Sequence, residues 1–246
     1  MQGASMKETL DEASRPLDEA SRPTEEPQKF QSHEESTTYK VASTQKEWEE
    51  AMDKEMDALY KNGTWNLCPL PLNKKATGCK WLYKLKFNKE GKVNRYKARL
   101  VAKGFAQQHG LDYDETYAPV AKMSSIKLLI SLASIFKWKL KQMDVNNAFL
   151  NGLLEEEVYK QQPKGYVVAR KEGMVCRLNK SLYGLKQAPR AWYGRIDDHL
   201  QSQGFQRSND DHTLYYKVQG KDIVLVIPYV DDLILTGSNE AMVEDV

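Results

Sequence analysis

The sequence contains few of the residues that build disulfide frameworks, zinc sites or membrane spans. Among its 246 residues are three cysteines and four histidines. No two cysteines form a CxxC pair, so neither a disulfide framework nor a zinc site is expected. No apolar run approaches the roughly 20 residues that a membrane-spanning helix needs. The start of the chain also lacks the apolar core of a signal peptide. These absences predict a soluble protein in a reducing, intracellular compartment.

Two stretches of the chain are each poor in charge of one sign. Residues 1–40 carry 5 Lys/Arg against 9 Asp/Glu, whereas residues 74–109 carry 11 Lys/Arg against a single acid, Glu90. The basic stretch is interleaved with aromatic side chains, a combination that attracts a phosphate backbone or a triphosphate. A solvated, lysine-rich hairpin is the alternative, and composition alone favours it.

The composition also divides the chain near residue 43. Residues 1–43 are rich in Glu, Ser, Pro and Thr and contain almost no large apolar side chains. They include a tandem heptad, LDEASRPLDEASRP, whose recurring proline argues against a coiled coil. We therefore predict a disordered acidic leader over residues 1–43 and a folded domain over residues 44–246.

Hydrophobic patterns in the folded part predict helices mixed with mainly antiparallel strands, which is an α+β fold. A helix is expected to begin at Thr44, whose spacing to Glu47 resembles a capping box, and to stop at Gly63. Two alternating strands around residues 88–91 predict a hairpin that carries the basic stretch. A buried helix is expected over residues 124–136 and a further helix over residues 189–204. Strands are expected over residues 213–218, 222–230 and 233–237, and a strand leading into a turn or short helix over residues 139–150.

Two adjacent carboxylates, Asp231 and Asp232, stand between the apolar runs VLVIPYV and LILTG. Charges in apolar surroundings are costly unless something compensates them. The pair therefore either lies harmlessly at a hairpin tip or holds a cation. A third acid, Asp144, ends a predicted strand, where a strand-end cap is the alternative. Acids brought together on adjoining strands supply the hard oxygen ligands that two Mg²⁺ ions need.

Eight motifs in family order resemble the reverse transcriptase domain of copia-type LTR retrotransposon polyproteins. The match runs from about Trp48 to Gly237 and consists of NGTWNL, KWLYKLK, RYKARLVAKGFAQ, DYDETYAPVA, QMDVNNAFLNG, LEEEVY, LNKSLYGLKQAPRAWY and YVDDLILTG. YVDD alone is a weak signal, whereas eight ordered motifs are a strong one. The resemblance implies a right-hand polymerase with fingers and palm. It also implies RNA-directed DNA synthesis from dNTPs on an RNA or DNA primer–template.

The same resemblance implies roles for individual residues. Asp144, Asp231 and Asp232 look like the catalytic acids, and together with Val145 they are the expected ligands of two Mg²⁺ ions, which Mn²⁺ could replace. In such a site one metal activates the primer 3′-hydroxyl and the other holds the triphosphate. The residues implied in substrate binding are Lys97, Arg99, Lys103, Val145, Ala148, Phe149, Gly184 and Tyr229.

Several of these roles have a structural alternative. Phe149 resembles a steric gate whose ring would collide with a ribose 2′-hydroxyl, but core packing is compatible with the same position. Tyr229 resembles a residue near the primer end, and a core tyrosine is the competing interpretation. The backbone amides of residues 145–148 would face the triphosphate. Lys186 and Arg190 either contact nucleic acid or are solvated.

Two departures from the family pattern bear on function. The sequence ends shortly after the predicted hairpin, where the family has a thumb and a ribonuclease H domain, so we expect a weak grip on primer–template. Pro228 replaces an aliphatic residue and has no N–H for the strand ladder, so we expect it to distort the hairpin that presents the acids. The alternatives to a working polymerase are a relic that binds nucleic acid without catalysis and a fragment without a role.

Overall fold

The computed structural model describes residues 38–246, and the heptad repeat lies outside these described residues. The first element is a four-residue helix, α1 (Tyr39–Ala42), in which Ala42 is buried. This short helix falls within the last residues of the predicted leader. The division of the chain at residue 43 otherwise stays a prediction.

Helix α2 (Lys46–Lys61) forms where the sequence places an apolar face, and Trp48, Met52 and Leu59 on that face are buried. Gly63 follows the helix with a backbone φ of +62°, as expected of a glycine that ends a helix. The predicted capping box is wrong. The residue preceding the helix is Gln45, and the Thr44 hydroxyl instead donates to the carbonyl of Val41 at 2.8 Å.

The basic stretch forms the predicted hairpin, with strands β2 (Cys79–Phe87) and β3 (Val93–Ala102) paired antiparallel. One face of this hairpin packs on α2. The ring of Trp48 meets the rings of Tyr83 and Tyr96 edge-on, with centroids 5.1 and 4.7 Å apart. Apolar residues of the hairpin therefore join α2 in one core cluster, and the basic residues lie mainly on the more exposed positions.

A small sheet that the sequence did not reveal lies next in the fold. Its strand order is β1-β6-β5, with β1 (Trp65–Cys68), β6 (Val175–Leu178) and β5 (Tyr159–Lys160) paired antiparallel. None of these strands exceeds four residues. Segments this short carry too little alternation to be distinguished from loops.

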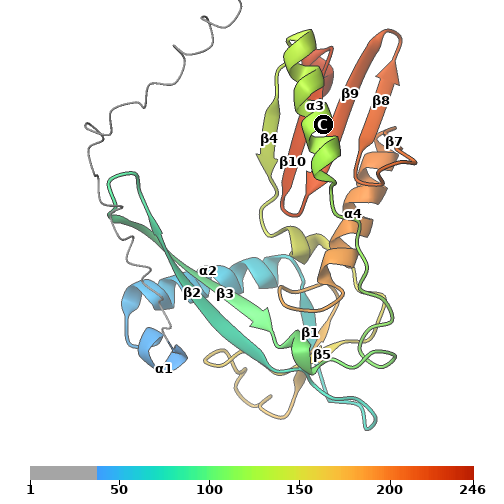
Figure 1. Ribbon diagram of the computed structural model, residues 1–246. Helices are drawn as coiled ribbons and strands as arrows, with labels where there is room; N and C mark the ends of the chain where they lie inside the picture. The colour runs from blue at the N-terminus through green and yellow to red at the C-terminus, as the bar shows by residue number, and fades with distance from the viewer. Residues whose placement is uncertain (1–37) are drawn as a thin grey trace, which may run out of the picture. The chain divides into compact units, whose positions relative to one another are not determined.

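The sheet that carries the predicted acids has five strands. In spatial order its strands are β4 (Lys141–Asp144), β10 (Asp232–Gly237), β9 (Asp222–Tyr229), β8 (Tyr215–Gln219) and β7 (Gln206–Arg207), and every neighbouring pair is antiparallel. The remaining elements of this part are α3 (Met123–Phe136), η2 (Ala148–Asn151), α4 (Ala188–Ser202) and α5 (Glu240–Glu244). Figure 1 shows α3 lying along this sheet, with α4 running beside it.

Each face of this sheet has its own apolar core, because side chains alternate between the two faces of a strand. Leu233 and Leu235 of β10 pack with the apolar residues of α4, whereas Ile234 packs with those of α3. Helix α3 was expected to be buried, but only one side of it is. Leu128 and Ile135 are 54% and 71% exposed. The predicted α+β class is confirmed by these antiparallel sheets and their helices.

Pro228 does not disturb the pairing of β9 with β10. The register runs without a shift from Val224↔Gly237 to Tyr229↔Asp232, and Pro228 lies opposite Leu233. On its other side β9 pairs with β8 only as far as Val226. Pro228 therefore lies beyond the paired part of β8, where no ladder hydrogen bond requires its missing N–H. The expected distortion of the hairpin is not seen.

Among the described residues, 38–246, no helix is both long enough and apolar enough to cross a bilayer.

Candidate functional site

The three predicted acids meet at one end of the five-stranded sheet. Strands β4 and β10 are in a register that places Asp144 directly opposite Asp232, and Asp231 immediately precedes Asp232 in the chain. Side chains directly opposite on antiparallel strands have Cβ atoms about 4.5–5.5 Å apart, and like charges in such pairs repel. The Gln142 amide donates to Asp232 Oδ1 at 3.1 Å, which offsets part of this repulsion. The cluster of carboxylates is therefore costly to the fold by itself.

The turn that carries Asp231 is strained. Tyr229 pairs with Asp232, which leaves a two-residue connection of Val230 and Asp231. Val230 has a backbone φ of +56°, a conformation that is unusual for a β-branched residue and costs of order 1–3 kcal/mol. Such strain persists only where surrounding contacts hold it in place.

Two hydrogen bonds hold the turn from opposite sides. Trp192 of α4 donates its indole Nε1–H to the carbonyl of Val230 at 2.7 Å. The backbone N–H of Val145 donates to the carbonyl of Asp231, also at 2.7 Å. The strained turn is thus fixed between α4 and the segment that follows β4. The Val145 amide was expected to face a triphosphate, but it is engaged in this bond.

Replacing Trp192 by phenylalanine removes the first of these bonds. We expect the free energy of unfolding to fall by about 1–2 kcal/mol, since the Val230 carbonyl loses its partner. Amide hydrogen exchange at residues 230–232 should also become faster. Trp138→Phe is the matched control, because that indole stacks on Phe136 and donates no hydrogen bond within the described part of the chain. Equal changes in urea unfolding and in exchange for both variants would contradict a specific role for Trp192.

The carboxylate of Asp231 is the least satisfied group of the site. Its Oδ1 atom is buried and has no hydrogen-bond partner among residues 38–246. Burial raises the pKa of Asp231, and the neighbouring charges of Asp144 and Asp232 raise it further, while Arg99 and Lys97 counteract the rise. A buried, unpaired carboxylate oxygen costs free energy unless a proton or a cation meets it. The site is therefore prepared to accept a positive charge.

The basic hairpin brings two cations to this carboxylate. Lys97 and Arg99 are two residues apart on β3, so they share one face of the strand. The Arg99 guanidinium lies 5.4 Å from the centroid of the Tyr183 ring, and Arg99, Tyr183 and Asp231 line the same narrow cleft. Arg99 is the strongest of the charges that favour ionised Asp231. Two of the three basic residues predicted in this hairpin thus face the acids.

A further acid, Glu55 of α2, supports this arrangement. Its Oε1 accepts the backbone N–H of Leu100 at 3.2 Å. Burial raises the pKa of Glu55, although Leu100, Arg99 and Lys97 counteract that rise. Burial together with the nearby positive charges of Arg99, Arg95 and Lys86 lowers the pKa of Lys97.

Phe149 borders the same cleft as Asp231. The residue is partly buried and packs against both core clusters, the one around α2 and the one between α4 and the sheet. Its ring lies 5.5 Å from the ring of Tyr183, and its carbonyl accepts the hydroxyl of Ser181. Both interpretations of Phe149, the steric gate and the core residue, are compatible with this position. Ala148 beside it is buried.

Gly184 meets a requirement of packing. Its φ is +92°, and a Cβ there would stand 2.4 Å from the carbonyl oxygen of Ala102. A Cβ on Gly104 would in turn stand 2.0 Å from the carbonyl oxygen of Gly184. The two glycines therefore let the end of β3 lie directly against the segment that precedes α4.

The other predicted residues lie in different settings. Lys103 is exposed, and its side chain lies beside Gly78, so its predicted role at the triphosphate stays a prediction. Tyr229 is 42% exposed at the hairpin end. The Lys186 ammonium donates to the carbonyl of Gln107 at 3.2 Å, and Arg190 forms an ion pair with Glu115. Lys186 and Arg190 thus hold the segment around residues 107–115 in place.

The carboxylates do not form a closed metal cage. Within residues 38–246, no three Asp, Glu, His or Cys side chains are gathered so that they could hold a metal ion. They form instead a cross-strand pair, Asp144 and Asp232, and a neighbour with an unpartnered buried oxygen. Mg²⁺ is usually bound through one or two carboxylates, with waters and substrate phosphates completing its shell. The pair of carboxylates on β4 and β10 supplies the number and kind of protein ligands that such a shell requires.

Sequence reasoning missed three residues that shape the site: Glu55, Tyr183 and Trp192. Tyr183 and Trp192 fall inside the motif SLYGLKQAPRAW, so their neighbourhood was a signal, although no spacing pointed to their contacts. Glu55 lies on a helix far away in the sequence, and no local pattern links it to Leu100.

Comparison with known proteins agrees with the geometry. The family described as reverse transcriptase (RNA-dependent DNA polymerase) matches residues 62–246. The Pol polyprotein of transposon TNT 1-94 from Nicotiana tabacum is 47% identical over 194 residues, which cover 78% of this chain and 15% of that protein. The Pol polyprotein of transposon RE2 from Arabidopsis thaliana is 46% identical over 80% of this chain and 14% of that protein.

A more distant relative is similar over a comparable part of the chain. The Gag-Pol polyprotein of transposon Ty1-DR4 from Saccharomyces cerevisiae is 29% identical over 84% of this chain and 13% of its own length. The chain thus spans about a seventh of the length of the plant relatives. The predicted resemblance is confirmed: the chain belongs to the reverse transcriptase family, and its plant relatives are copia-type Pol polyproteins.

Proposed function

We propose that this chain is the fingers and palm of an RNA-directed DNA polymerase, which adds deoxynucleotides to the 3′-hydroxyl of a primer. In this proposal α2 and the β2–β3 hairpin form the fingers, and the five-stranded sheet with α3 and α4 forms the palm. The observation that carries it is the cross-strand pair Asp144–Asp232 beside Asp231, whose unpartnered oxygen shares a cleft with Arg99. RNA templates and dNTPs also imply an intracellular setting, in a cytoplasmic particle or the nucleus.

Asp144, Asp231, Asp232 and the carbonyl of Val145 would hold two Mg²⁺ ions, or Mn²⁺ in their place. When bound, such ions acidify the attacking hydroxyl and stabilise the charge on the transferred and leaving phosphates. The protein's own contribution is to hold these oxygens at the end of a paired hairpin, with the turn fixed by Trp192. Because these oxygens are already held in position, the protein would not need to rearrange when the substrate binds.

The residues around the acids would bind the nucleotide. Lys97 and Arg99 would attract the triphosphate, and the exposed Lys103 would contact the phosphate or template farther along the hairpin. The Val145 amide is used in the turn, so the amides of residues 146–148 would be the ones to meet phosphate oxygens. Ala148 and Phe149 would lie under the sugar, where the ring would exclude a 2′-hydroxyl.

Primer and template would contact two further positions. Tyr229, 42% exposed beside Asp232, is placed to pack near the primer end. Because Gly184 has no side chain, it would leave the surface next to α4 open, so that a nucleic-acid backbone could approach it closely.

The proposal is tested by extension of oligo(dT) on poly(rA) with dTTP and Mg²⁺. The wild-type chain is expected to extend the primer, and Asp144→Asn or Asp231→Asn to reduce extension by at least about 100-fold, since even outer partners of metal ligands matter 10–100-fold. Asp57→Asn, a change at an exposed aspartate of α2, is the matched control and should leave extension unchanged.

A different outcome would favour a binding function. The exposed basic hairpin offers a surface for nucleic acid whether or not the acids are competent. A folded chain that binds primer–template but does not extend the primer with Mg²⁺ or Mn²⁺ would contradict the polymerase proposal. It would support a relic that grips nucleic acid through residues 74–109.

A further inference from the structure

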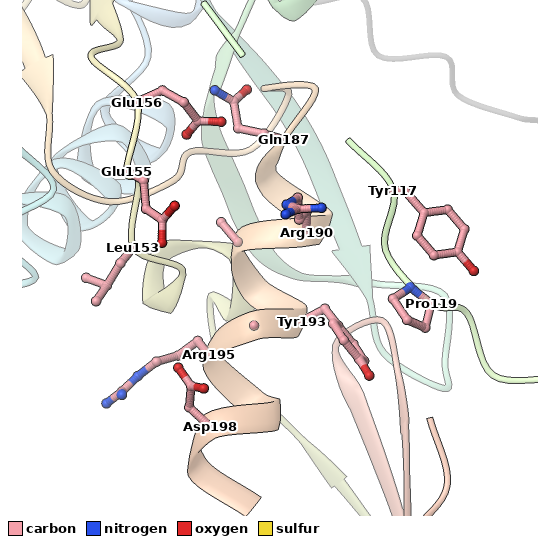
Figure 2. A pocket seen from close by; sticks show the side chains of 12 residues that line it. Tyr117, Pro119, Leu153, Glu155, Glu156, Gln187, Arg190, Tyr193, Arg195 and Asp198 are labelled. Carbon is pink, nitrogen blue, oxygen red and sulfur yellow. The ribbon is translucent and has the colours of Figure 1, made fainter. Parts of the chain in front are cut away.

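A cavity of about 450 Å³ opens on the side of α4 that faces away from the sheet. The buried residues Trp192, Ile196 and Leu200 of α4 point to the sheet, whereas Arg190, Gly194 and Asp198 line the cavity. Figure 2 shows the side chains of Glu155 and Glu156 on one side of α4 and those of Tyr117 and Pro119 on the other. The cavity is therefore separate from the carboxylates on β4 and β10.

Gly194 in the floor of this cavity has no explanation within the folded chain. A glycine inside a helix costs roughly 0.5–1 kcal/mol relative to alanine. Gly152 and Gly184 are required by close packing, because a Cβ on either would stand under 3 Å from backbone atoms. A Cβ on Gly194, by contrast, would have no atom of the described residues within 4 Å outside its own helix backbone. The missing side chain keeps the floor of the cavity open.

The walls of the cavity combine aromatic rings with unpaired negative charge. Tyr117 is 70% exposed, and the hydroxyl of Tyr193 is taken by the carbonyl of His212, which leaves the ring to line the cavity. Within residues 38–246, Glu155 and Glu156 form no ion pair. Both also border an adjoining cavity that contributes further acids, namely Asp114, Glu115 and Glu157.

The cations nearby do not neutralise these carboxylates. Arg190 is paired with Glu115, and Lys74 is paired with Glu157. Arg195 is the remaining cation of the cavity, and Asp198 lies near it in Figure 2. The surface around Glu155 and Glu156 therefore keeps an excess of negative charge.

The aromatic rings and the negative charge together indicate what kind of group could bind in this cavity. Phosphate groups would be repelled by the carboxylates, so nucleic acid is a poor match. The leader of this chain is also a poor match, because residues 1–40 carry a net charge of −4. An arginine side chain fits both features, since its guanidinium stacks on tyrosine rings and binds carboxylates through paired hydrogen bonds.

We propose that this cavity is a docking site for an arginine-bearing basic segment of a protein partner. One arginine of the segment stacks on Tyr117 and Tyr193 on one side of α4, and a second basic side chain meets Glu155 and Glu156 on the other side. The main chain of the segment crosses α4 at Gly194. This docking site is independent of the polymerase proposal, because it uses none of the residues around Asp231.

The test measures binding of a fluorescein-labelled octa-arginine peptide to the full chain by fluorescence anisotropy at physiological ionic strength. Glu155→Gln/Glu156→Gln is expected to weaken binding about tenfold, as two exposed charge contacts are lost. Glu47→Gln/Asp57→Asn on α2 changes the net charge equally and is the matched control, which should weaken binding less than about twofold. Any binding to the acidic leader is the same in both variants.

A second variant tests the cavity apart from its charge. Gly194→Leu fills the floor from a Cβ position that no atom of residues 38–246 approaches within 4 Å, so we expect the melting temperature not to fall. Binding of the peptide should nevertheless weaken about tenfold, because the crossing segment is displaced. Three results would overturn the proposal: no binding to the wild type, equal weakening in both double variants, or unchanged binding to Gly194→Leu.

Discussion

Replacing Asp231 by asparagine is expected to make the protein more stable while it ends primer extension. The carboxylate has a buried oxygen without a partner, and Asp144 and Asp232 repel its charge. An unsatisfied buried polar group costs about 1–3 kcal/mol, and the amide of asparagine brings a donor without charge. In a chain of this size each 1 kcal/mol corresponds to about 2–4 °C in melting temperature. A gain of several degrees by thermal melting is therefore expected.

The pH dependence of stability provides a second test of the expected stabilisation by Asp231→Asn. Because burial raises the pKa of Asp231 in the folded state, the folded protein binds a proton more readily than the unfolded chain does. Its ionised carboxylate therefore destabilises the fold above the raised pKa, and this cost disappears as the pH falls towards the unfolded value near 4. The stability gap between Asp231→Asn and wild type should thus be largest at neutral pH and close on acidification.

Mg²⁺ should reverse the order of stability. A cation that binds the folded state raises the melting temperature by mass action, and the wild type should gain more than Asp231→Asn. Asp57→Asn should gain as much as the wild type. If Asp231→Asn proved less stable than the wild type at neutral pH without Mg²⁺, the picture of an uncompensated carboxylate would be wrong.

Two glycine-to-alanine changes should act in opposite directions. Gly184→Ala forces a Cβ to within 2.4 Å of the Ala102 carbonyl at a φ of +92°. Overpacking costs about 1–3 kcal/mol, and a left-handed backbone adds about 1–2 kcal/mol. We expect a loss of about 3 kcal/mol in the free energy of unfolding, measured by urea denaturation.

Gly194→Ala is the matched control. This glycine lies within α4 and nothing stands within 4 Å of the added methyl group, so alanine should stabilise the helix by about 0.5–1 kcal/mol. Similar small effects of the two substitutions would show that the end of β3 can move away from Gly184. The junction between the basic hairpin and α4 would then be looser than the structure indicates.

Local patterns predicted most of the long elements. The apolar face of α2, the alternation in β2 and β3, and the run from β9 to β10 each place several apolar side chains against a core, so the sequence signal is strong. The sheet of β1, β5 and β6 escaped prediction because strands of two to four residues bury too few side chains to leave a pattern. The capping box at Thr44 failed because its hydroxyl found the Val41 carbonyl instead.

The site was predictable only in part, for a physical reason. Asp144, Asp231 and Asp232 were found through motifs, and strand pairing then gave the first and last of them one register. The contacts of Trp192 with Val230 and of Glu55 with Leu100 join elements far apart in the sequence. Such contacts are decided by how helices pack on sheets, and no periodicity records them.

Because β4 must pair with β10 in one register, the number of residues between α3 and β4 matters to the carboxylate cluster as much as the identity of the acids. Residues 137–140 join α3 to β4, whose register with β10 places Asp144 opposite Asp232. If one residue inserted or deleted there shifted β4 by a single step, Asp144 would turn to the opposite face of the sheet. Helix α3 and the β9–β10 hairpin would remain intact after such a change. Copies of this gene segment could thus lose the carboxylate cluster through a three-nucleotide indel while every acid in the sequence is preserved.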